Sequence, residues 1–591
     1  TKDALTVGGV SKTDDVLPVL ESTYRELLRA ARGGFTVSEY ERAKSEYLSR
    51  LERAYNNRAD VENNSYVQEY VNNFLTNEPI PSIETEYQIM QQWVPNIPLQ
   101  MINQVLPELV TENNRVVLAM LPEKDGVALP TPEQMAEVIA KVNAEEIEPY
   151  LDEVKDEPLI PQLPAPGKIV SEKQCDQFGA TVLTLSNGVK VIVKPTKFKA
   201  DEILFEAIAK NGMMQIDDAL AADVKFFDYA ASQAGLGTYT STDVQKYLSG
   251  KQANISPELG TTSRSITGFS TPKDLPTLME LIYATFTEVS INEDEFAAIQ
   301  NRMSGALKNQ ENNPQYIFGR DLMKALFEAP ARQTLTTDDI AAATRENFIK
   351  IAHDMTDNAA NFTFVFVGNI DMDTFRPLVE QYIATLPADA ATADKEIIDN
   401  PRFDMKGGKG IDEFTTKMET PQTYVFIGSI AEVPYTAKNR VAASAMGQIL
   451  SKRLLETVRE DMGAVYSIGA AAQLSRNPGK NLALQTSFPM KPEMRKEVLD
   501  FIEAEINRMQ SDIKPEELAK VTEFMVKEAT EGKENNSSWL NGITGFTLNE
   551  VDTFNGDVDV IQSVTVEDVQ NLVKEIINQG NYRIVTLDAA E

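Results

Sequence analysis

The sequence predicts an α+β protein, an α/β sandwich built from repeated domains, each with a mostly antiparallel β-sheet covered by helices on one face. Three observations support this prediction. The chain has 591 residues, which is too long for one ordinary hydrophobic core. One arrangement of a short strand and two long helices recurs three times along it. Strand-like runs also alternate with long helical ones, which is typical of sheets packed against helices.

Each repeat is expected to begin with a short strand and a long amphipathic helix, followed by a second helix. The expected strands are residues 4–7, 265–269 and 482–486, and the first helices start near residues 15, 275 and 495. The second helices start within residues 36–44, 291–296 and 513–518. Their first turns are acidic, as the helix dipole favours, and Ser38, Asn292 and Pro515 are common near a helix N-terminus.

The agreement continues through the rest of each repeat. An asparagine pair follows each second helix: Asn63-Asn64, Asn312-Asn313 and Asn535-Asn536. Each repeat then closes with a β-rich run, at residues 115–120, 362–367 and 582–587. Because order and spacing agree three times, we interpret the pattern as internal repetition.

The second and third repeats have front halves that the first one lacks. Residues 182–193 predict a β-hairpin around Asn187-Gly188, and residues 422–428 predict a strand. The proline-rich residues 157–167 predict a semi-extended linker. We therefore expect a truncated domain at 1–125, a linker at 126–170, a complete domain at 171–395 and a C-terminal domain at 396–591. We also expect that upstream sequence, including any targeting segment, is missing.

Composition excludes several classes of function. The net charge of −33 disfavours nucleic acid and anionic membrane surfaces as partners, and no stretch is apolar enough to span a bilayer. The single cysteine, Cys175, cannot form an internal disulfide, and the single histidine, His353, excludes zinc sites with two or three histidines. The acidic surface is consistent either with solubility alone or with attraction of basic peptides.

Residues 451–470 carry the most informative motif. Leu454 and Val458 have helical spacing, Gly463 ends the predicted helix, and residues 465–468 predict a strand. Arg459 is then expected near the helix C-terminus and Tyr466 on the strand, close enough to face one space. A guanidinium and a phenol hydroxyl can hold a peptide carbonyl or an oxyanion, although a solvated arginine and a half-buried tyrosine are commoner.

This segment resembles the arginine–tyrosine element of the pitrilysin/insulinase-type zinc metallopeptidase family, in which a helix ending in Arg is followed by Gly and by Tyr on a strand. The repeats resemble the homologous α/β domains of that family, four of which make up full-length members. Residues 185–191 resemble the hairpin that opens such domains. The resemblance covers essentially the whole chain and implies that it forms one half of a clam-shell.

The zinc motif of that family is not matched. The family's inverted H-x-x-E-H helix normally lies in the first domain. The corresponding helix of the middle domain, residues 219–229, contains no histidine and resembles the family's degenerate domains. We therefore assign no metal ligand to this chain. The resemblance implies a C-terminal portion that encloses peptides or small unfolded chains, with Arg459 and Tyr466 contacting the substrate and zinc bound by the protein's own N-terminal half.

Two alternatives stay open. The chain could be a non-catalytic partner or scaffold subunit that pairs with a homologous catalytic subunit. It could also be a peptide-binding module that uses its acidic surface. An H-x-x-E-H motif upstream of Thr1 would favour the peptidase. Peptide specificity, oligomeric state and the compartment, periplasm or cytoplasm, are left open by the sequence.

Overall fold

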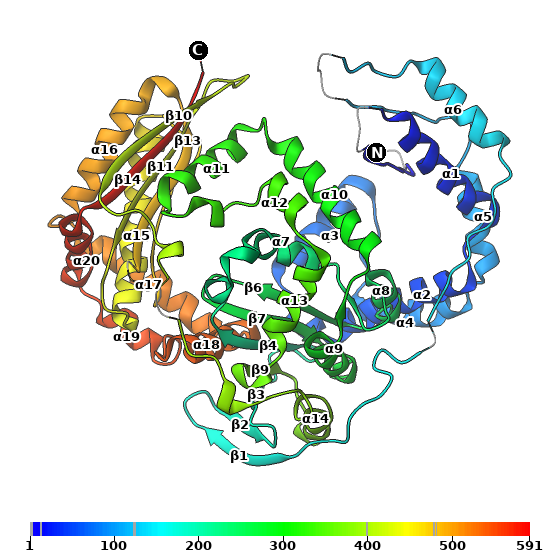
Figure 1. Ribbon diagram of the computed structural model, residues 1–591, viewed down its shortest axis with the longest axis horizontal. Coiled ribbons are helices and arrows are strands. Elements are labelled where there is room, and N and C mark those ends of the chain that lie inside the picture. Colours follow the sequence, from blue (N-terminus) through cyan, green and yellow to red (C-terminus); the bar gives the residue numbers. More distant parts are fainter. Residues whose placement is uncertain are drawn as a thin grey trace. The chain divides into compact units, whose positions relative to one another are not determined.

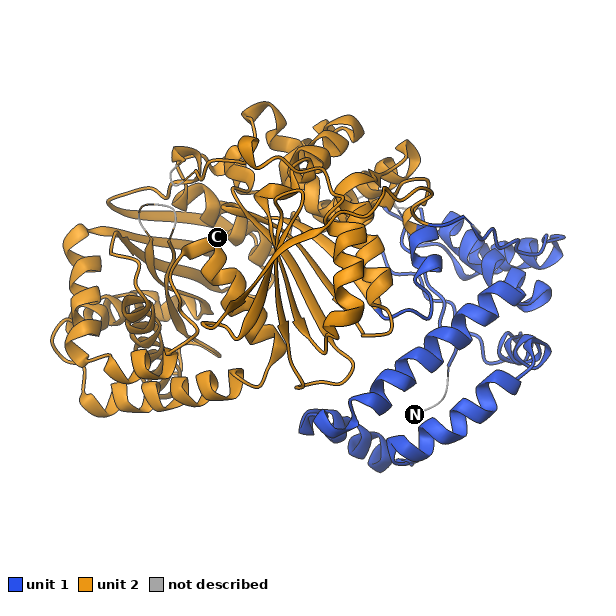
Figure 2. Cartoon of the chain, turned by 90° about the horizontal axis from the view of Figure 1, so that it is seen from below, with its two compact units in different colours: residues 1–158, 242–252 blue, residues 159–241, 253–591 orange. Residues whose placement is uncertain are grey.

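The computed structural model divides the chain into two compact units, which are described separately (Figure 2). Unit 1 comprises residues 1–158 and 242–252, and unit 2 comprises residues 159–241 and 253–591. The structure describes residues 4–11, 15–121, 126–155, 157–397, 400–476, 479 and 481–590.

Unit 1 is helical, and its described residues contain no strand (Figure 1). Its helices are α1 (Leu17–Gly33), α2 (Val37–Asn56), α3 (Asn63–Thr76), α4 (Ile83–Trp93), α5 (Leu99–Leu109), α6 (Pro132–Ala144) and most of α8 (Ser241–Tyr247). The strands expected at 4–7 and 115–120 are therefore wrong for this structure. A strand needs a neighbour to satisfy its backbone N–H and C=O groups, and these two segments pair with no strand among the described residues.

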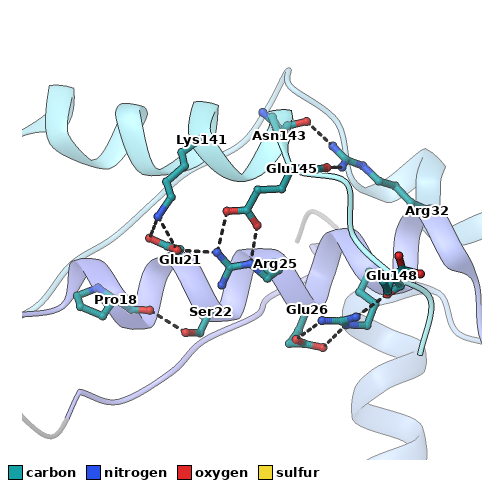
Figure 3. Close-up of polar contacts among 11 residues, drawn as sticks. Pro18, Glu21, Ser22, Arg25, Glu26, Arg32, Lys141, Asn143, Glu145 and Glu148 are labelled. Carbon is teal, nitrogen blue, oxygen red and sulfur yellow. Dashed lines mark hydrogen bonds and ion pairs between the residues drawn. The ribbon is translucent and has the colours of Figure 1, made fainter. Parts of the chain in front are cut away.

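Helices α1 and α6 are joined by charged side chains, which Figure 3 shows in close-up. Arg25 Nε lies 2.6 Å from Glu145 Oε2, and Lys141 Nζ lies 2.8 Å from Glu21 Oε1. Tyr24, Leu28 and Val142 form a small buried cluster between the same helices. The segment 126–170, expected as a linker, thus includes a helix that packs within unit 1.

The first sheet of unit 2 has seven strands in the order β1-β2-β3-β9-β4-β7-β6. Only β3 and β9 pair in parallel, so the sheet is mostly antiparallel, as expected. The strands are β1 (Ile169–Cys175), β2 (Ala180–Leu185), β3 (Lys190–Pro195), β4 (Ile203–Lys210), β6 (Ala253–Leu259), β7 (Ser263–Ser270) and β9 (Thr363–Gly368). Two short strands, β5 (Gly235–Leu236) and β8 (Val289–Ser290), form a separate ribbon.

The predicted hairpin joins β2 to β3. Gly188 has a φ of +85°, which the left-handed turn requires and glycine adopts at little cost. The Asn187 side-chain amide donates to the carbonyls of Ile383 and Leu386. These two bonds hold the turn against residues 383–386.

The second sheet repeats this topology with five strands in the order β10-β14-β11-β13-β12. Its only parallel pair is β10 with β14, which matches β3 with β9 in the first sheet. The strands are β10 (Lys409–Thr416), β11 (Thr423–Ala431), β12 (Ala470–Leu474), β13 (Leu482–Met490) and β14 (Asn581–Ala589). The β-rich runs at the ends of the second and third repeats are thus β9 and β14, each at an inner position of its sheet.

Each sheet is covered on one face by helices of its own repeat. Over the first sheet lie α7 (Ala221–Ala231), α9 (Leu275–Thr287), α10 (Glu293–Gln310), α12 (Thr337–Ala342), α13 (Arg345–Thr356) and α14 (Met372–Leu378). Over the second lie α15 (Ala437–Leu454), α16 (Arg495–Arg508), α17 (Pro515–Gly532) and α20 (Val566–Gln579), with α19 (Asp557–Ser563) beside α15 and α17. The expected α+β class is confirmed.

The opposite face of each sheet is covered by a helix from the other repeat, which the sequence did not predict. Helix α18 (Asn536–Asn549) packs on β4 and β9 of the first sheet (Figure 1). Helix α11 (Pro314–Leu326) packs on β10, β11 and β14 of the second. The two domains of unit 2 are therefore joined by a reciprocal exchange of helices.

Candidate functional site

The predicted arginine–tyrosine element lies where α15 ends. The helix passes into a π-helical turn over Leu455–Asp461, which carries Arg459 on an exposed surface. Gly463 follows with a φ of +62° and ends the helix, as predicted. Turns of π-helix are rare and occur frequently at functional sites, so this turn is a reasonable place for a ligand-binding side chain.

Tyr466 lies in the loop after this turn, and its side chain is 91% exposed. The strand expected at residues 465–468 is wrong, because β12 begins only at Ala470. The loop is held at both ends by the neighbouring β13 segment: Lys491 N donates to the Ala464 carbonyl, and Thr486 Oγ1 donates to the Gly469 carbonyl. Between these two points the backbone leaves the sheet, which presents Tyr466 to solvent.

Arg453, in the last turn of α15, is a structural residue that the sequence reasoning missed. Its guanidinium donates to Glu505 at 2.6 Å, to Glu517 at 2.5 and 2.7 Å, and to the Asp512 carbonyl at 2.7 Å. Hydrogen bonding from Arg453 is the main reason that the pKa of Glu517 lies below its usual range. Because Glu505 belongs to α16 and Glu517 to α17, Arg453 ties three helices together beneath the candidate site.

A sequence signal for Arg453 did exist. Met446, Ile449, Leu450 and Leu454 form the apolar stripe of α15, and Arg453 falls on that stripe. A charge in a core-facing position requires a buried counter-charge, which could have directed attention to the acidic residues of later helices.

Gly447 fixes the distance between α15 and β12. A Cβ atom at this position would lie 2.4 Å from the backbone nitrogen of Ala472. The helix therefore approaches the strand backbone directly, and the loop with Tyr466 connects two elements that are already in close contact.

The sequence analysis expects α7 to correspond to the zinc-binding helix of the resembled family, and in the structure the α7 side chains make contacts that stabilise the fold. The buried Asp223 carboxylate accepts hydrogen bonds from Thr344 N at 2.8 Å and Asn347 Nδ2 at 3.1 Å, so it caps α13. Lys225 pairs with Asp339 at 2.6 Å. Phe226 and Phe227 pack against aromatic rings of the core.

These residues do not fit a zinc ion. Both oxygens of Asp223 are already hydrogen-bonded, and the neighbouring positions hold a paired lysine and buried phenylalanines. Within the part of the chain that the structure describes, no group of three or more His, Cys, Asp or Glu residues could hold a metal ion. The side chain of His353 on α13 is 76% exposed. Every helix in the described part of the chain is too short or too polar to span a bilayer.

Comparison with known proteins finds similarity to zinc proteases. Residues 342–524 match the family model described as the peptidase M16 inactive domain. The chain is 24% identical over 539 residues to a zinc protease PQQL-like protein of Arabidopsis thaliana, covering 86% of this chain. The chain is thus homologous to zinc proteases of the PqqL type and contains a region that matches the peptidase M16 inactive domain, which confirms the resemblance expected from the sequence.

Two solved structures share the fold. The periplasmic protease PqqL from Escherichia coli superposes with a TM-score of 0.66 at 19% identity, covering 98% of this chain and 64% of that one. The ferredoxin protease FusC in complex with Arabidopsis ferredoxin gives a TM-score of 0.68 at 15% identity, covering 99% of this chain and 66% of that one. The chain spans 52% of the Arabidopsis relative's length.

Proposed function

We propose that this chain is the C-terminal, substrate-enclosing portion of an M16-type zinc metallopeptidase that hydrolyses peptides or small unfolded chains, with the metal site in an N-terminal part outside this chain. The observation that carries the proposal is the geometry around α15: Arg459 and the 91%-exposed Tyr466 are presented to solvent by elements that Arg453 and Gly447 hold in place. In this proposal α7 is a degenerate copy of the metal-binding helix, which is consistent with the structural contacts of Asp223 and Lys225.

In this proposal Tyr466 and Arg459 donate hydrogen bonds to the substrate. A phenol hydroxyl and a guanidinium can both donate to a peptide carbonyl and, more strongly, to the oxyanion that forms when water attacks it. Zinc bound elsewhere in the protein would activate that water. The net charge of −33 would favour substrates that are not themselves strongly acidic.

The test uses the chain alone and together with its N-terminal half. We expect no cleavage of unstructured peptides by this chain with added zinc, and chelator-sensitive cleavage when the N-terminal half is present. Chelator-sensitive cleavage by the isolated chain would contradict the proposal, because no zinc ligands are assigned to it.

A second candidate is a non-catalytic partner subunit. It is favoured by the family model that this chain matches, which describes an inactive domain, and by the structural role of Asp223. The two candidates differ in the sequence upstream of this chain. An H-x-x-E-H motif there supports the peptidase, and a full N-terminal half without it supports the partner subunit.

A further inference from the structure

Helix α3 of unit 1 has an exposed apolar face. It consists of Tyr66, Val67, Tyr70, Val71, Phe74 and Leu75, whose exposed fractions run from 39% for Tyr66 to 86% for Phe74. We call these six residues the α3 face. Their spacing places them on one side of the helix. Six exposed apolar side chains along one side of a helix are typical of an interaction surface.

The internal repeat shows what such a face does. The asparagine pairs mark corresponding helix starts: α3 begins with the first pair, α11 begins directly after the second, and α18 begins at the second residue of the third. Counted from the N-cap residues Glu62 and Asn313, the six positions of the α3 face correspond to six positions of α11. Those positions are Ile317, Phe318, Asp321, Leu322, Ala325 and Leu326, and all except the half-buried Leu322 are buried.

Helix α18 agrees in part: three of the six corresponding positions are buried, and the other three, Trp539, Thr547 and Leu548, are half-buried. Counted from its N-cap Asn535, the positions that match Val67, Tyr70 and Val71 are Leu540, Ile543 and Thr544. All three of these α18 side chains are buried. The corresponding helix face is therefore a contact surface in the second and third repeats, where a sheet of the other domain in unit 2 covers it.

The surface that α11 and α18 cover is the open face of a β-sheet in another domain. Ile317 and Phe318 of α11 pack with Phe426, Val585 and Leu587 of the second sheet. Leu540 and Ile543 of α18 pack with Val365 and Val367 of the first sheet. In both cases the helix reaches beyond its own repeat, and the sheet supplies β-branched and aromatic side chains.

A second copy of this chain offers no such surface among the described residues. The open face of its first sheet is occupied by α18, and that of its second sheet by α11. The homologous proteins are longer than this chain, which covers 52% and 61% of two of them. A further domain of the same repeat type is thus the occupant with the matching surface.

We propose that the α3 face is the docking site for the open face of a β-sheet in a further α/β domain of this repeat type, located in the N-terminal part of the protein. This proposal rests on the proposed function, which assigns the protein an N-terminal part in addition to this chain. The partner surface is apolar, contributed by at least two adjacent strands, and rich in β-branched and aromatic residues. Tyr70 and Phe74 are its central contacts.

The test measures binding of the polypeptide encoded immediately ahead of Thr1, produced separately, by isothermal titration calorimetry. The wild-type chain is compared with the double variant Tyr70→Ser/Phe74→Ser. The matched control is Phe524→Ser, which removes a large exposed side chain from α17. All three residues are exposed, so circular dichroism should show the same helix content in each variant.

We expect the double variant to bind about tenfold or more weakly, because central aromatic contacts dominate interface energetics, and the control to bind as the wild type does. Hydrogen exchange at residues 63–76 should slow in the complex. Equal binding by the double variant and the wild type would overturn the docking site. Self-association of the chain that the double variant abolishes would also overturn it, since the occupant would then be a second copy.

Peptide cleavage by the mixture reports the proposed function separately. Chelator-sensitive cleavage together with unchanged binding of the double variant overturns the docking site alone. Intact, α3-dependent binding without any cleavage overturns the peptidase and leaves the docking site in place.

Discussion

Arg453 and Glu505 form a buried salt bridge, with 2.6 Å between Arg453 Nη1 and Glu505 Oε1 and side chains that are 8% and 2% exposed. The pair connects α15 to α16, and Glu517 extends it to α17. A buried ion pair contributes little net stability relative to apolar residues, but removing one partner leaves the other charge buried alone. Its effect here is to hold the end of α15, and therefore the π-helical turn with Arg459, in one position.

Arg453→Ala should lower the free energy of unfolding by about 3 kcal/mol, because the buried Glu505 would keep only Arg508, whose side chain is 55% exposed, as a charged partner. Urea denaturation measures the change. Lys496→Ala, which breaks the exposed pair with Asp500, is the control and should change stability by less than about 0.5 kcal/mol. A similar small effect for Arg453→Ala would show that the three helices do not depend on this pair.

Tyr466→Phe should lower kcat of the complete protein by about 100-fold, the typical cost of losing one donor to a developing oxyanion. Because Tyr466 is 91% exposed, the melting temperature should not change. Tyr229→Phe removes the hydroxyl of another exposed tyrosine and is the control. Unchanged turnover in Tyr466→Phe would remove Tyr466 from the site.

Asp223→Ala should destabilise the protein by about 1–3 kcal/mol, because the Thr344 amide and the Asn347 side chain would lose their acceptor. Peptidase activity per folded molecule of the complete protein should stay the same. Thermal unfolding and active-site titration together check both parts. A loss of kcat without a loss of stability would assign Asp223 a role in the reaction.

Stability should fall at acid pH through Asp152, which is buried in unit 1. Burial alone would raise its pKa, but hydrogen bonds from Arg42, Lys246 and Ser38 outweigh that effect and hold the pKa well below the ordinary value of 3.8. A carboxyl whose folded-state pKa is lowered stabilises the fold above its unfolded-state pKa. That contribution is lost as the pH falls below 3.8 toward the folded-state pKa.

The measurement compares urea midpoints between pH 6 and pH 2 for the wild type and Asp152→Asn. The variant should be less stable at pH 6 and should lose less stability on acidification than the wild type. Glu112→Gln, at an exposed position of the same unit, should follow the wild-type curve. Parallel curves for Asp152→Asn and the wild type would contradict the assignment.

Local sequence signals were enough to predict the hairpin at Asn187-Gly188, the helix starts near Thr36 and Asn292, the helix end at Gly463, and the shared plan of the second and third repeats. These features depend on local physics: turn chemistry, capping and hydrophobic periodicity act within a few residues. Thr36 and Asn292 each form a capping box in the structure, and Gly463 adopts the left-handed conformation that ends the helix.

The absence of strands at residues 4–7, 115–120 and 465–468 could be seen only in the three-dimensional structure. The sequence pattern of a strand is local, but a strand exists only where a neighbour accepts its hydrogen bonds. For residues 115–120 the described chain supplies no partner, and for residues 465–468 the loop leaves β13 to expose Tyr466.

The exchange of α11 and α18 between sheets, and the buried Arg453, were also decided by tertiary structure. Each depends on residues far apart in the chain: Phe318 meets Tyr424, and Arg453 meets Glu505 and Glu517. Hydrophobic periodicity indicates which face of a helix will be buried, but it does not identify the surface against which that face packs. The α3 face carries the same periodicity as α11, and the contacts of α11 and α18 within unit 2 support the partner that we propose for it.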